Sequence, residues 1–427
     1  MSRTCPIFGA TATIASAAQA HRGRLLKVLA AATSALFSAA ACAVDAVGYA
    51  RIGTGDAANP HRTCYNLGIS GGHYRLGNEC DIYGELGLAH AATVEGVRYR
   101  GLVMANYHRP ANDGSDARAS LNQLFAEGRG LPGAPDVDFW LGQRFYGRAD
   151  VHILDTHFVR MDGAGLGAHG ITWGAAKVGI AYFRVDAGSG APLGVQTSSR
   201  PARRVNIDVT DIALGGSGQL RVTATFTRGH DEPASAESGT RGVALGVQHD
   251  QRLHGIGGAH RAWLQYAQGS AALDANFGTM TANPAVAQWR VVESLTWQSG
   301  AFGGQVVALY GRHDADPPHG IATRYAELSI GARVSYAVSP QVKLMAEAGH
   351  MEKRPDRSGT QRLTKLTLAP TWSAGPGFSD RPELRLYMTT ARWNDAANAG
   401  AGAAGLAGLG DGATRGTSWG VQLETWF

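Results

Sequence analysis

The last ten residues of the chain, SWGVQLETWF at 418–427, place apolar and polar side chains on opposite faces of an extended strand. Counted back from the terminus by twos, one face is mostly apolar, and the other carries Trp426 beside Glu424. A period of two is the spacing of a β-strand, in which successive side chains point to opposite faces. Similar runs fill most of the chain, and their polar faces combine aromatic with charged residues. The repetition therefore predicts an all-β transmembrane antiparallel β-barrel, which the final strand closes.

The strand-like runs cover residues 44–427, and we assign them to a single barrel domain of about 18 strands. No run of about 18 apolar residues follows the N-terminal region, which argues against membrane helices there. Residues 108–135 are expected to form a polar loop, and the Gly/Ala-rich residues 394–417 a mobile external loop. The predicted strands are 47–53, 81–88, 97–107, 137–145, 171–175, 178–185, 203–213, 218–228, 242–250, 260–269, 287–298, 302–312, 324–337, 342–352, 361–373, 383–393 and 418–427.

Residues 1–43 have the pattern of a secretory signal peptide. A basic region at 22–27 precedes an apolar stretch of small residues at 28–41, and an A-C-A cleavage sequence follows. We expect cleavage near Ala43/Val44, with a lipoprotein site at Cys42 as the alternative. Export to an oxidising compartment predicts a disulfide between Cys64 and Cys80, with two free thiols as the alternative.

The formal net charge of +5 does not describe the exported chain. Four of the 39 basic residues lie in the leader, which has no acidic residue, so 35 basic residues face 34 acidic ones after cleavage. A nearly neutral chain lacks the general basic field that binds nucleic acid, and no nucleic-acid partner is expected.

Residues 147–168 differ from the rest of the chain because they are rich in charge and histidine and alternate weakly. A long segment of this kind in a barrel is expected to fold inward and narrow the channel. A solvated surface loop, or acid/base and metal chemistry, are the alternatives. The chain has no G-x-S-x-G or H-E-x-x-H motif, so we predict neither an enzyme nor a bound metal or cofactor. The crowded residues are Arg144, Arg148, Asp150, His152, Asp155 and His157.

Several aromatic residues share a strand face with charged residues rather than with Leu and Val. A pyranose ring stacks its C–H face on an aromatic ring, and its hydroxyl groups hydrogen-bond to charged side chains. A row of such sites would let a sugar chain slide through a polar bore. The alternative is an interfacial aromatic girdle, for which Trp419, Trp297 and Phe427 are better candidates. The same-face sets are Tyr49 with Arg51, Tyr83 with Asp81 and Glu85, Trp263 with Arg261 and Gln265, Trp393 with Arg385, and Trp426 with Glu424.

At these residues the chain resembles the maltoporin family. The matching runs are GYARIG, YRLGNECDIYGEL, RFYGRADVHILD, RPELRLYMTTARW and the closing WGVQLETWF. The resemblance implies a homotrimer of 18-stranded barrels in the bacterial outer membrane. It also implies facilitated diffusion of maltose and maltodextrins along an aromatic slide edged by polar tracks. Carried over residue by residue, Tyr49, Tyr83, Trp393 and Trp426 correspond to slide aromatics, Arg51, Arg75, Glu85, Arg148, Asp150 and Asp155 to polar-track or constriction groups, and Cys64–Cys80 to the first-loop disulfide.

The chain also departs from the family pattern. His157 stands where the family has a constriction tyrosine, and Ala259 stands at a slide phenylalanine, whose place Trp263 could take. The loop at 108–124 has no aromatic residue to offer a neighbouring subunit, and Asn122 replaces an expected arginine.

We therefore expect a passive sugar-selective porin. A general diffusion porin, a porin for another sugar such as sucrose, and an outer-membrane enzyme are the alternatives. Outer-membrane lipid and, through the outer loops, bacteriophage are expected partners.

Overall fold

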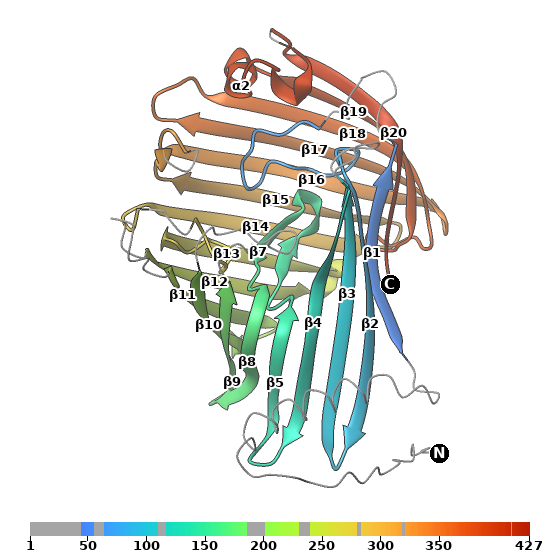
Figure 1. Cartoon of the computed structure of the whole chain (residues 1–427). Coiled ribbons are helices and arrows are strands. Elements are labelled where there is room, and N and C mark those ends of the chain that lie inside the picture. The colour runs from blue at the N-terminus through green and yellow to red at the C-terminus, as the bar shows by residue number, and fades with distance from the viewer. Residues whose placement is uncertain are drawn as a thin grey trace.

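The computed structural model describes residues 44–54, 64–109, 117–185, 201–229, 240–279, 283–317, 321–410 and 412–427. The expected signal peptide, residues 1–43, lies outside the described residues. In the part of the chain that the structure describes, 18 strands form one antiparallel sheet. Because β1 (Asp45–Gly53) pairs with β20 (Arg415–Trp426), the sheet closes into a barrel (Figure 1). The predicted fold class is therefore confirmed.

Successive strands pair along the chain, except that β5 pairs with β8 across an intervening segment. The other barrel strands are β2 (Ile82–Val94), β3 (Val97–Arg109), β4 (Arg118–Leu131), β5 (Ala134–Arg144), β8 (Gly163–Trp173), β9 (Ala176–Val185), β10 (Ala202–Ala213), β11 (Gly218–Gly229), β12 (Arg241–Leu253), β13 (Gly258–Gly269), β14 (Ala287–Ser299), β15 (Phe302–His313), β16 (Tyr325–Ser339), β17 (Val342–Pro355), β18 (Gln361–Ser373) and β19 (Glu383–Trp393). The smaller elements are β6 (Ala149–Val151), β7 (Thr156–Val159), α2 (Asp395–Gly400), and the 3-10 turns η1 (His152–Leu154), η2 (His254–Ile256) and η4 (Leu406–Gly408).

Alternation fixes which face of each strand meets the bore. On β19, buried and exposed residues alternate at every position: Leu384 and Leu386 are exposed, whereas Arg385 is buried. Charged side chains on the inner wall form ion pairs. For example, Lys343 Nζ lies 2.6 Å from Glu383 Oε1. Within the described residues, no helix is long and apolar enough to span a membrane.

The sequence prediction of a polar loop over 108–135 is wrong, because β4 occupies much of that range. The register between β3 and β4 slips after the pair Met104–Gln123. At this β-bulge Asn122 and Gln123 are both buried, while Leu121 and Leu124 are both exposed. The bulge interrupts the period of two, so the sequence of β4 lacks the alternation by which the other strands were predicted. A similar shift between Ala168 and Ile171 shortens the predicted strand that became β8.

The two ends of the barrel differ in their connections. Short turns join pairs such as β2 to β3, between Val94 and Val97, and β4 to β5, between Leu131 and Ala134. The opposite end carries the longer connections, such as those at residues 54–81 and 394–414. Outer-membrane barrels have short periplasmic turns and longer extracellular loops, which gives the barrel its orientation.

Segments 64–81, 145–162 and 270–279 fold into the barrel instead of extending from it. Tyr74 is completely buried, and its ring covers Gly331 and Gly349 on the inner wall. A Cβ atom at Gly349 would lie 2.3 Å from the Tyr74 ring, so this close approach requires glycine. The inward segments therefore supply the core that a barrel of this width would otherwise lack.

The Gly/Ala-rich connection after β19, where a mobile external loop was predicted, contains α2 and η4 in its described part. Asn394 caps α2, and its side chain accepts a hydrogen bond from the Ala397 amide at 3.1 Å. Ala397 and Leu406 are buried with Trp393 in one apolar cluster. Small residues let this segment pack closely over the end of the barrel.

Candidate functional site

The segment at 145–162 forms a small hairpin inside the barrel. Strands β6 and β7 pair with each other, and η1 joins them. Asp155 ends η1 in the left-handed region (φ 51°), a conformation that Asp tolerates better than most residues. This turn points one face of the hairpin, with Asp155 and His157, into the open bore. The other face buries Val151, Ile153 and Phe158.

Barrel residues hold the hairpin in place from behind. The ring of Phe158 packs on Trp263 of β13 at a centroid distance of 5.1 Å. Arg204 of β10 donates to the carbonyl oxygens of Met161 and Asp162 at 2.9 and 2.8 Å. Arg148 closes the base of the hairpin on the Asp162 carboxylate, with Nε 2.9 Å from Oδ2. Apolar packing and charged hydrogen bonds thus fix the hairpin against the wall.

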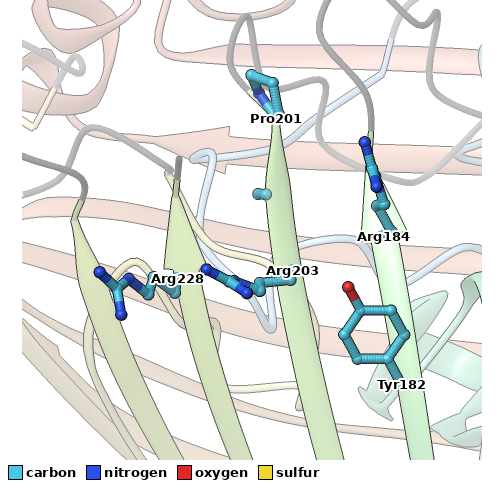
Figure 2. Close-up of a pocket in the computed structure, with 6 residues that line it drawn as sticks. Tyr182, Arg184, Pro201, Arg203 and Arg228 are labelled. Carbon is cyan, nitrogen blue, oxygen red and sulfur yellow. The ribbon is translucent and has the colours of Figure 1, made fainter. Parts of the chain in front are cut away.

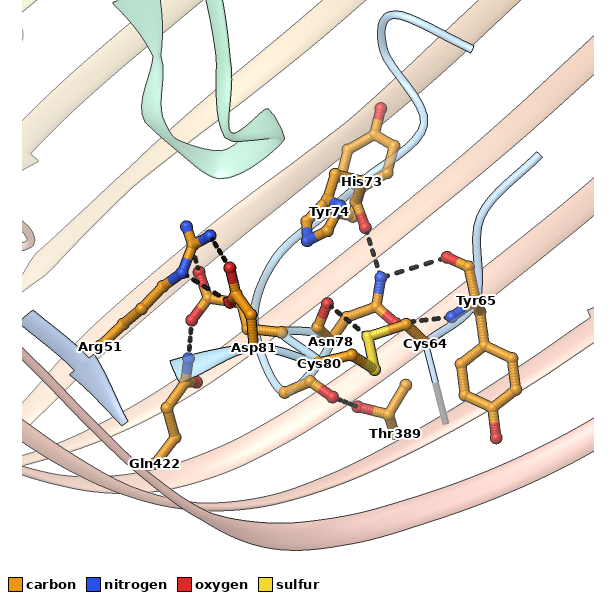
Figure 3. Close-up of a disulfide and its surroundings, with 12 residues drawn as sticks. Arg51, Cys64, Tyr65, His73, Tyr74, Asn78, Cys80, Asp81, Thr389 and Gln422 are labelled. Carbon is orange, nitrogen blue, oxygen red and sulfur yellow. Dashed lines mark hydrogen bonds and ion pairs between the residues drawn. A yellow bond between two sulfur atoms is a disulfide. The ribbon is translucent and has the colours of Figure 1, made fainter. Parts of the chain in front are cut away.

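The first inward segment is tied by a disulfide between Cys64 and Cys80, with Cα atoms 5.9 Å apart (Figure 3). Inside the closed loop, the Asn78 side chain accepts from the Tyr65 amide at 2.8 Å and donates to the His73 carbonyl at 2.7 Å. The disulfide and these hydrogen bonds define the position of Arg75 within the loop.

The two inward segments contact each other directly. The Arg75 amide donates to the Ile153 carbonyl at 3.0 Å, and the Thr156 hydroxyl donates to the Ser70 carbonyl at 2.8 Å. Each segment therefore supports the other, and together they narrow the bore and leave it open beside β1 and β2.

An open cavity of about 400 Å³ lies between the hairpin and strands β20, β1, β2 and β3. Its volume falls within the range of about 300–1,000 Å³ that is usual for small-molecule sites. Its lining combines rings with charges of both signs: Tyr49, Arg51, Arg75, Asp81, Tyr83, Glu85, His108, Arg148, Asp150, His152, Asp155, His157, Arg160 and Trp426.

The rings of this cavity come from adjacent strands. Trp426 of β20 is the register partner of Tyr49 on β1, and Tyr83 of β2 is that of His108 on β3. The Tyr49 and Tyr83 centroids lie 6.1 Å apart, and those of Tyr83 and His108 lie 6.3 Å apart. His152 of the hairpin meets the Trp426 ring edge-on at 5.5 Å. The four wall rings form a lateral row, which we call the ring row.

Charged groups cross from the wall to the hairpin beside the ring row. The Arg51 guanidinium donates to Asp81 Oδ2 and to Asp155 Oδ2, both at 2.7 Å (Figure 3 shows the first contact). Arg75 lies 3.1 Å from Glu424 and 3.6 Å from Asp155. Asp155 therefore forms ion pairs with two arginines, Arg51 of β1 and Arg75 of the first inward segment. These ion pairs line one side of the narrowed bore.

The ionisation of the hairpin follows from burial and these charges. Burial raises the pKa of Asp155, but the guanidinium groups of Arg75 and Arg51 outweigh burial, and the net pKa lies below the ordinary value. Burial lowers the pKa of His157, and the charge of Arg148 lowers it further. At neutral pH, Asp155 is therefore ionised and His157 is neutral.

A second cavity of about 560 Å³ lies on the other side of the hairpin tip. Asp155, His157 and Arg160 line both cavities. The two cavities therefore meet at the hairpin tip. Among the described residues, no group of three or more His, Cys, Asp or Glu side chains is placed to hold a metal ion.

Most of the predicted site residues meet in the first cavity, but two of the predicted rings do not. Trp263 is 2% exposed beneath Phe158, and Trp393 is 5% exposed, with its ring 5.9 Å from that of Tyr65. The sequence analysis did not single out His108 or Arg160. His108 follows the alternation of β3 directly beside Tyr83, so extending that strand by one residue would have found it.

A closed β-barrel with an apolar outer wall and a charged bore narrowed by inward segments is an outer-membrane porin. The chain belongs to the LamB porin family, whose sequence profile matches residues 44–427. It is therefore a multi-pass barrel of the bacterial outer membrane and a member of a family of transport channels.

Two kinds of comparison accompany this assignment. The chain is 29% identical over 392 residues to a maltoporin of Hahella chejuensis (strain KCTC 2396), covering 86% of this chain and 91% of the relative. Its fold is similar to a BenF-like porin from Pseudomonas fluorescens Pf-5, with a TM-score of 0.51, 10% identity, and coverage of 90% of this chain and 98% of the other. It is also similar to Acinetobacter baumannii OccAB1, with a TM-score of 0.50, 9% identity, and coverage of 90% and 95%. At these identities the solved structures support the fold alone.

Proposed function

We propose that the protein is a passive porin for oligosaccharides of the maltose and maltodextrin type, and that the ring row is its sugar path. The observation that carries the proposal is the shared cavity, in which Tyr49, Tyr83 and Trp426 lie on adjacent strands opposite the charged hairpin. The similarity to a maltoporin supports the same substrate class.

The arrangement suits a solute with an apolar face and a hydroxyl rim. Centroid spacings of about 6 Å let one sugar ring contact two neighbouring aromatic rings before it leaves the first. The carboxylates and guanidinium groups beside the rings can exchange hydrogen bonds with sugar hydroxyls as the solute moves. Many weak and similar contacts allow entry without trapping the solute, as conduction requires.

In this proposal the residues divide into three roles. Tyr49, Tyr83 and Trp426 stack on the sugar, and Arg51, Arg75, Glu85, Arg148, Asp150, Asp155 and His157 form the polar track and constriction. Trp263 and Trp393 do not contact the sugar in this proposal. Trp263 supports the hairpin through Phe158, and Trp393 is covered by the segment that contains α2.

A less selective channel, or one for another sugar such as sucrose, is the second candidate function. The burial of Trp263 and Trp393 favours it, because the open ring row is shorter than the five rings expected from the sequence. His108 would end the row with a smaller and more polar ring.

Conductance in planar lipid bilayers tests the proposal. We expect maltotriose, added in steps, to block the ion current in a saturable manner, and sucrose to block it less well. If both sugars reduce the ion current equally and without saturation, the protein is a general diffusion porin. If neither sugar blocks the current at millimolar concentration, the sugar path is refuted. We further propose a homotrimer, as the family resemblance implies, which sedimentation in detergent would test.

A further inference from the structure

The side chain of Arg381 covers one face of the Trp426 ring. Its Cζ atom lies 4.3 Å from the ring centroid, within the range of a cation–π contact. Arg381 lies in the turn between β18 and β19, yet its side chain is only 2% exposed. Arginines of the outer wall, such as Arg203 and Arg228, are instead exposed beside a shallow hollow (Figure 2). Arg381 is therefore an interior arginine, and the ring that it covers belongs to the ring row.

Two carboxylates and two carbonyl groups hold the Arg381 guanidinium against the ring. Its Nε donates to Glu424 Oε2 at 2.9 Å, and its Nη1 lies 3.0 Å from Glu383 Oε1. Nη1 also donates to the carbonyl oxygens of Phe378 and Asp380 at 3.3 and 3.1 Å. Both carboxylates are fully buried on the inner wall. The N–H groups at the edge of the planar guanidinium are therefore bonded to the wall and the turn, while its flat face lies on the ring.

Trp426 keeps its other face open to the first cavity. His152 of the hairpin meets the ring edge-on, at an interplanar angle of 86°. Trp426 is still 37% exposed and lines the cavity beside Tyr49, its register partner on β1. Because Arg381 covers one face and His152 covers one edge, the open area lies on the opposite face. A sugar that stacks on Trp426 meets the ring on the side away from Arg381.

The orientation of this ring decides how much of its area a sugar can cover. A ring that becomes ordered only when the sugar arrives binds more weakly, because the ordering opposes association. In the channel without sugar, the stack on Arg381 and the edge contact with His152 already restrict the Trp426 side chain. A lysine would keep the charge at position 381, but an ammonium group cannot lie flat on a ring and bond two carboxylates along its edge.

We propose that Arg381 is a positioning residue of the sugar path: it stacks behind Trp426 and holds the ring in the orientation that the sugar needs, without contacting the sugar. For the identity of the solute, this role rests on the proposed function. The orientation of the ring is a property of the protein, however, and can be measured without any sugar.

Maltotriose block of the ion current in planar bilayers tests this role with Arg381→Lys, alone and combined with Trp426→Ala. We expect Arg381→Lys to raise the concentration for half-maximal block about two- to tenfold, because the sugar must then order the ring. In the Trp426→Ala background, the same substitution should change the block no further, because the ring through which Arg381 acts is absent.

Arg385→Lys is the matched control. The side chain of Arg385 is fully buried and pairs with the same two carboxylates, Glu383 and Glu424. Within the described residues, however, the cation over the Trp426 ring is Arg381 alone. The control therefore alters the same charge network without removing the stack, and its block by maltotriose should resemble that of the wild type.

Fluorine NMR of protein labelled with 5-fluorotryptophan observes the ring directly, and Trp426→Phe assigns its signal. The relaxation of this signal reports the motion of the ring. Without sugar, we expect a mobile ring in Arg381→Lys and a fixed ring in the wild type and in Arg385→Lys. A purely structural role of Arg381 in the barrel would not mobilise this one ring selectively.

The remaining outcomes also decide the proposal. A ring as immobile in Arg381→Lys as in the wild type, or an equal rise of the blocking concentration with and without Trp426, would overturn it. If maltotriose does not block the wild-type channel but the ring becomes mobile in Arg381→Lys alone, the proposed function fails and the positioning of Trp426 by Arg381 stands. If Arg381→Lys does not fold, Arg381→Gln is judged by the same two measurements.

Discussion

Replacing Trp426 with alanine tests the ring row at its most accessible member. Trp426 is 37% exposed on the cavity side, where Arg381 lies 4.3 Å from its ring centroid and His152 meets its edge. A tryptophan side chain offers roughly 250 Å² in all, so about 90 Å² is open to a solute. If a sugar covers about half of that area, and loses a similar area of its own, stacking contributes about 2 kcal/mol at roughly 25 cal/mol per Å².

We therefore expect Trp426→Ala to raise the maltotriose concentration for half-maximal block by about five- to thirtyfold, which corresponds to about 1–2 kcal/mol. The open-channel ion current should stay the same or rise, because the side chain becomes smaller. The matched control is Trp419→Ala on the same strand. Trp419 is 52% exposed on the opposite, lipid-facing side, and its loss should leave the block unchanged. Unchanged block in Trp426→Ala, or an equal loss in both variants, would refute the sugar path at this ring.

Three further predictions concern the inward segments. His157→Tyr should lower the single-channel conductance, because His157 lines both cavities at the hairpin tip and tyrosine is larger; a higher conductance would contradict that placement. Phe158→Ala should destabilise the hairpin by about 3 kcal/mol or more and speed its proteolysis in the folded barrel, since Phe158 is fully buried against Trp263; unchanged cleavage rates would show that the hydrogen bonds alone hold it. Burial lowers the pKa of His73 to about 4 in the first inward segment, so the folded loop binds fewer protons than the unfolded one. The stabilisation is complete above the ordinary pKa of about 6.5 and is lost as the pH falls toward 4. Amide protection factors in residues 64–81, which correct for the intrinsic pH dependence of exchange, should fall over that interval in the wild type but not in His73→Asn.

The barrel was largely predictable because its strands repeat a local rule. Residues such as Leu384 and Arg385 fall on opposite faces whatever their tertiary neighbours, so the period of two identified most strands. The rule fails where the backbone departs from it. At the bulge in β4, Asn122 and Gln123 both turn inward. A prediction based on alternation alone therefore assigns this segment to a loop.

The candidate site was predictable to a lesser extent, for a different reason. Alternation places a ring on the inner face of a strand but does not determine what covers it. Tyr49 and Tyr83 remain open to the cavity, whereas Trp263 lies under Phe158, and Trp393 lies under the segment that contains α2. Phe158 lies about a hundred residues from Trp263 in the sequence, and Tyr65, which also packs on Trp393, is more remote still from that ring. The α2 segment follows Trp393 directly, but packing of either kind leaves no periodic signal in the sequence.

The meeting of β1 and β20 has a consequence for biogenesis. Tyr49 comes from the first strand and Trp426 from the last, and they become neighbours only when the sheet closes. An unfinished barrel therefore has no complete passage for a solute, however much of its wall has already been inserted. Loss of the final strand would remove both the seam that closes the sheet and one ring of the proposed sugar path in a single event.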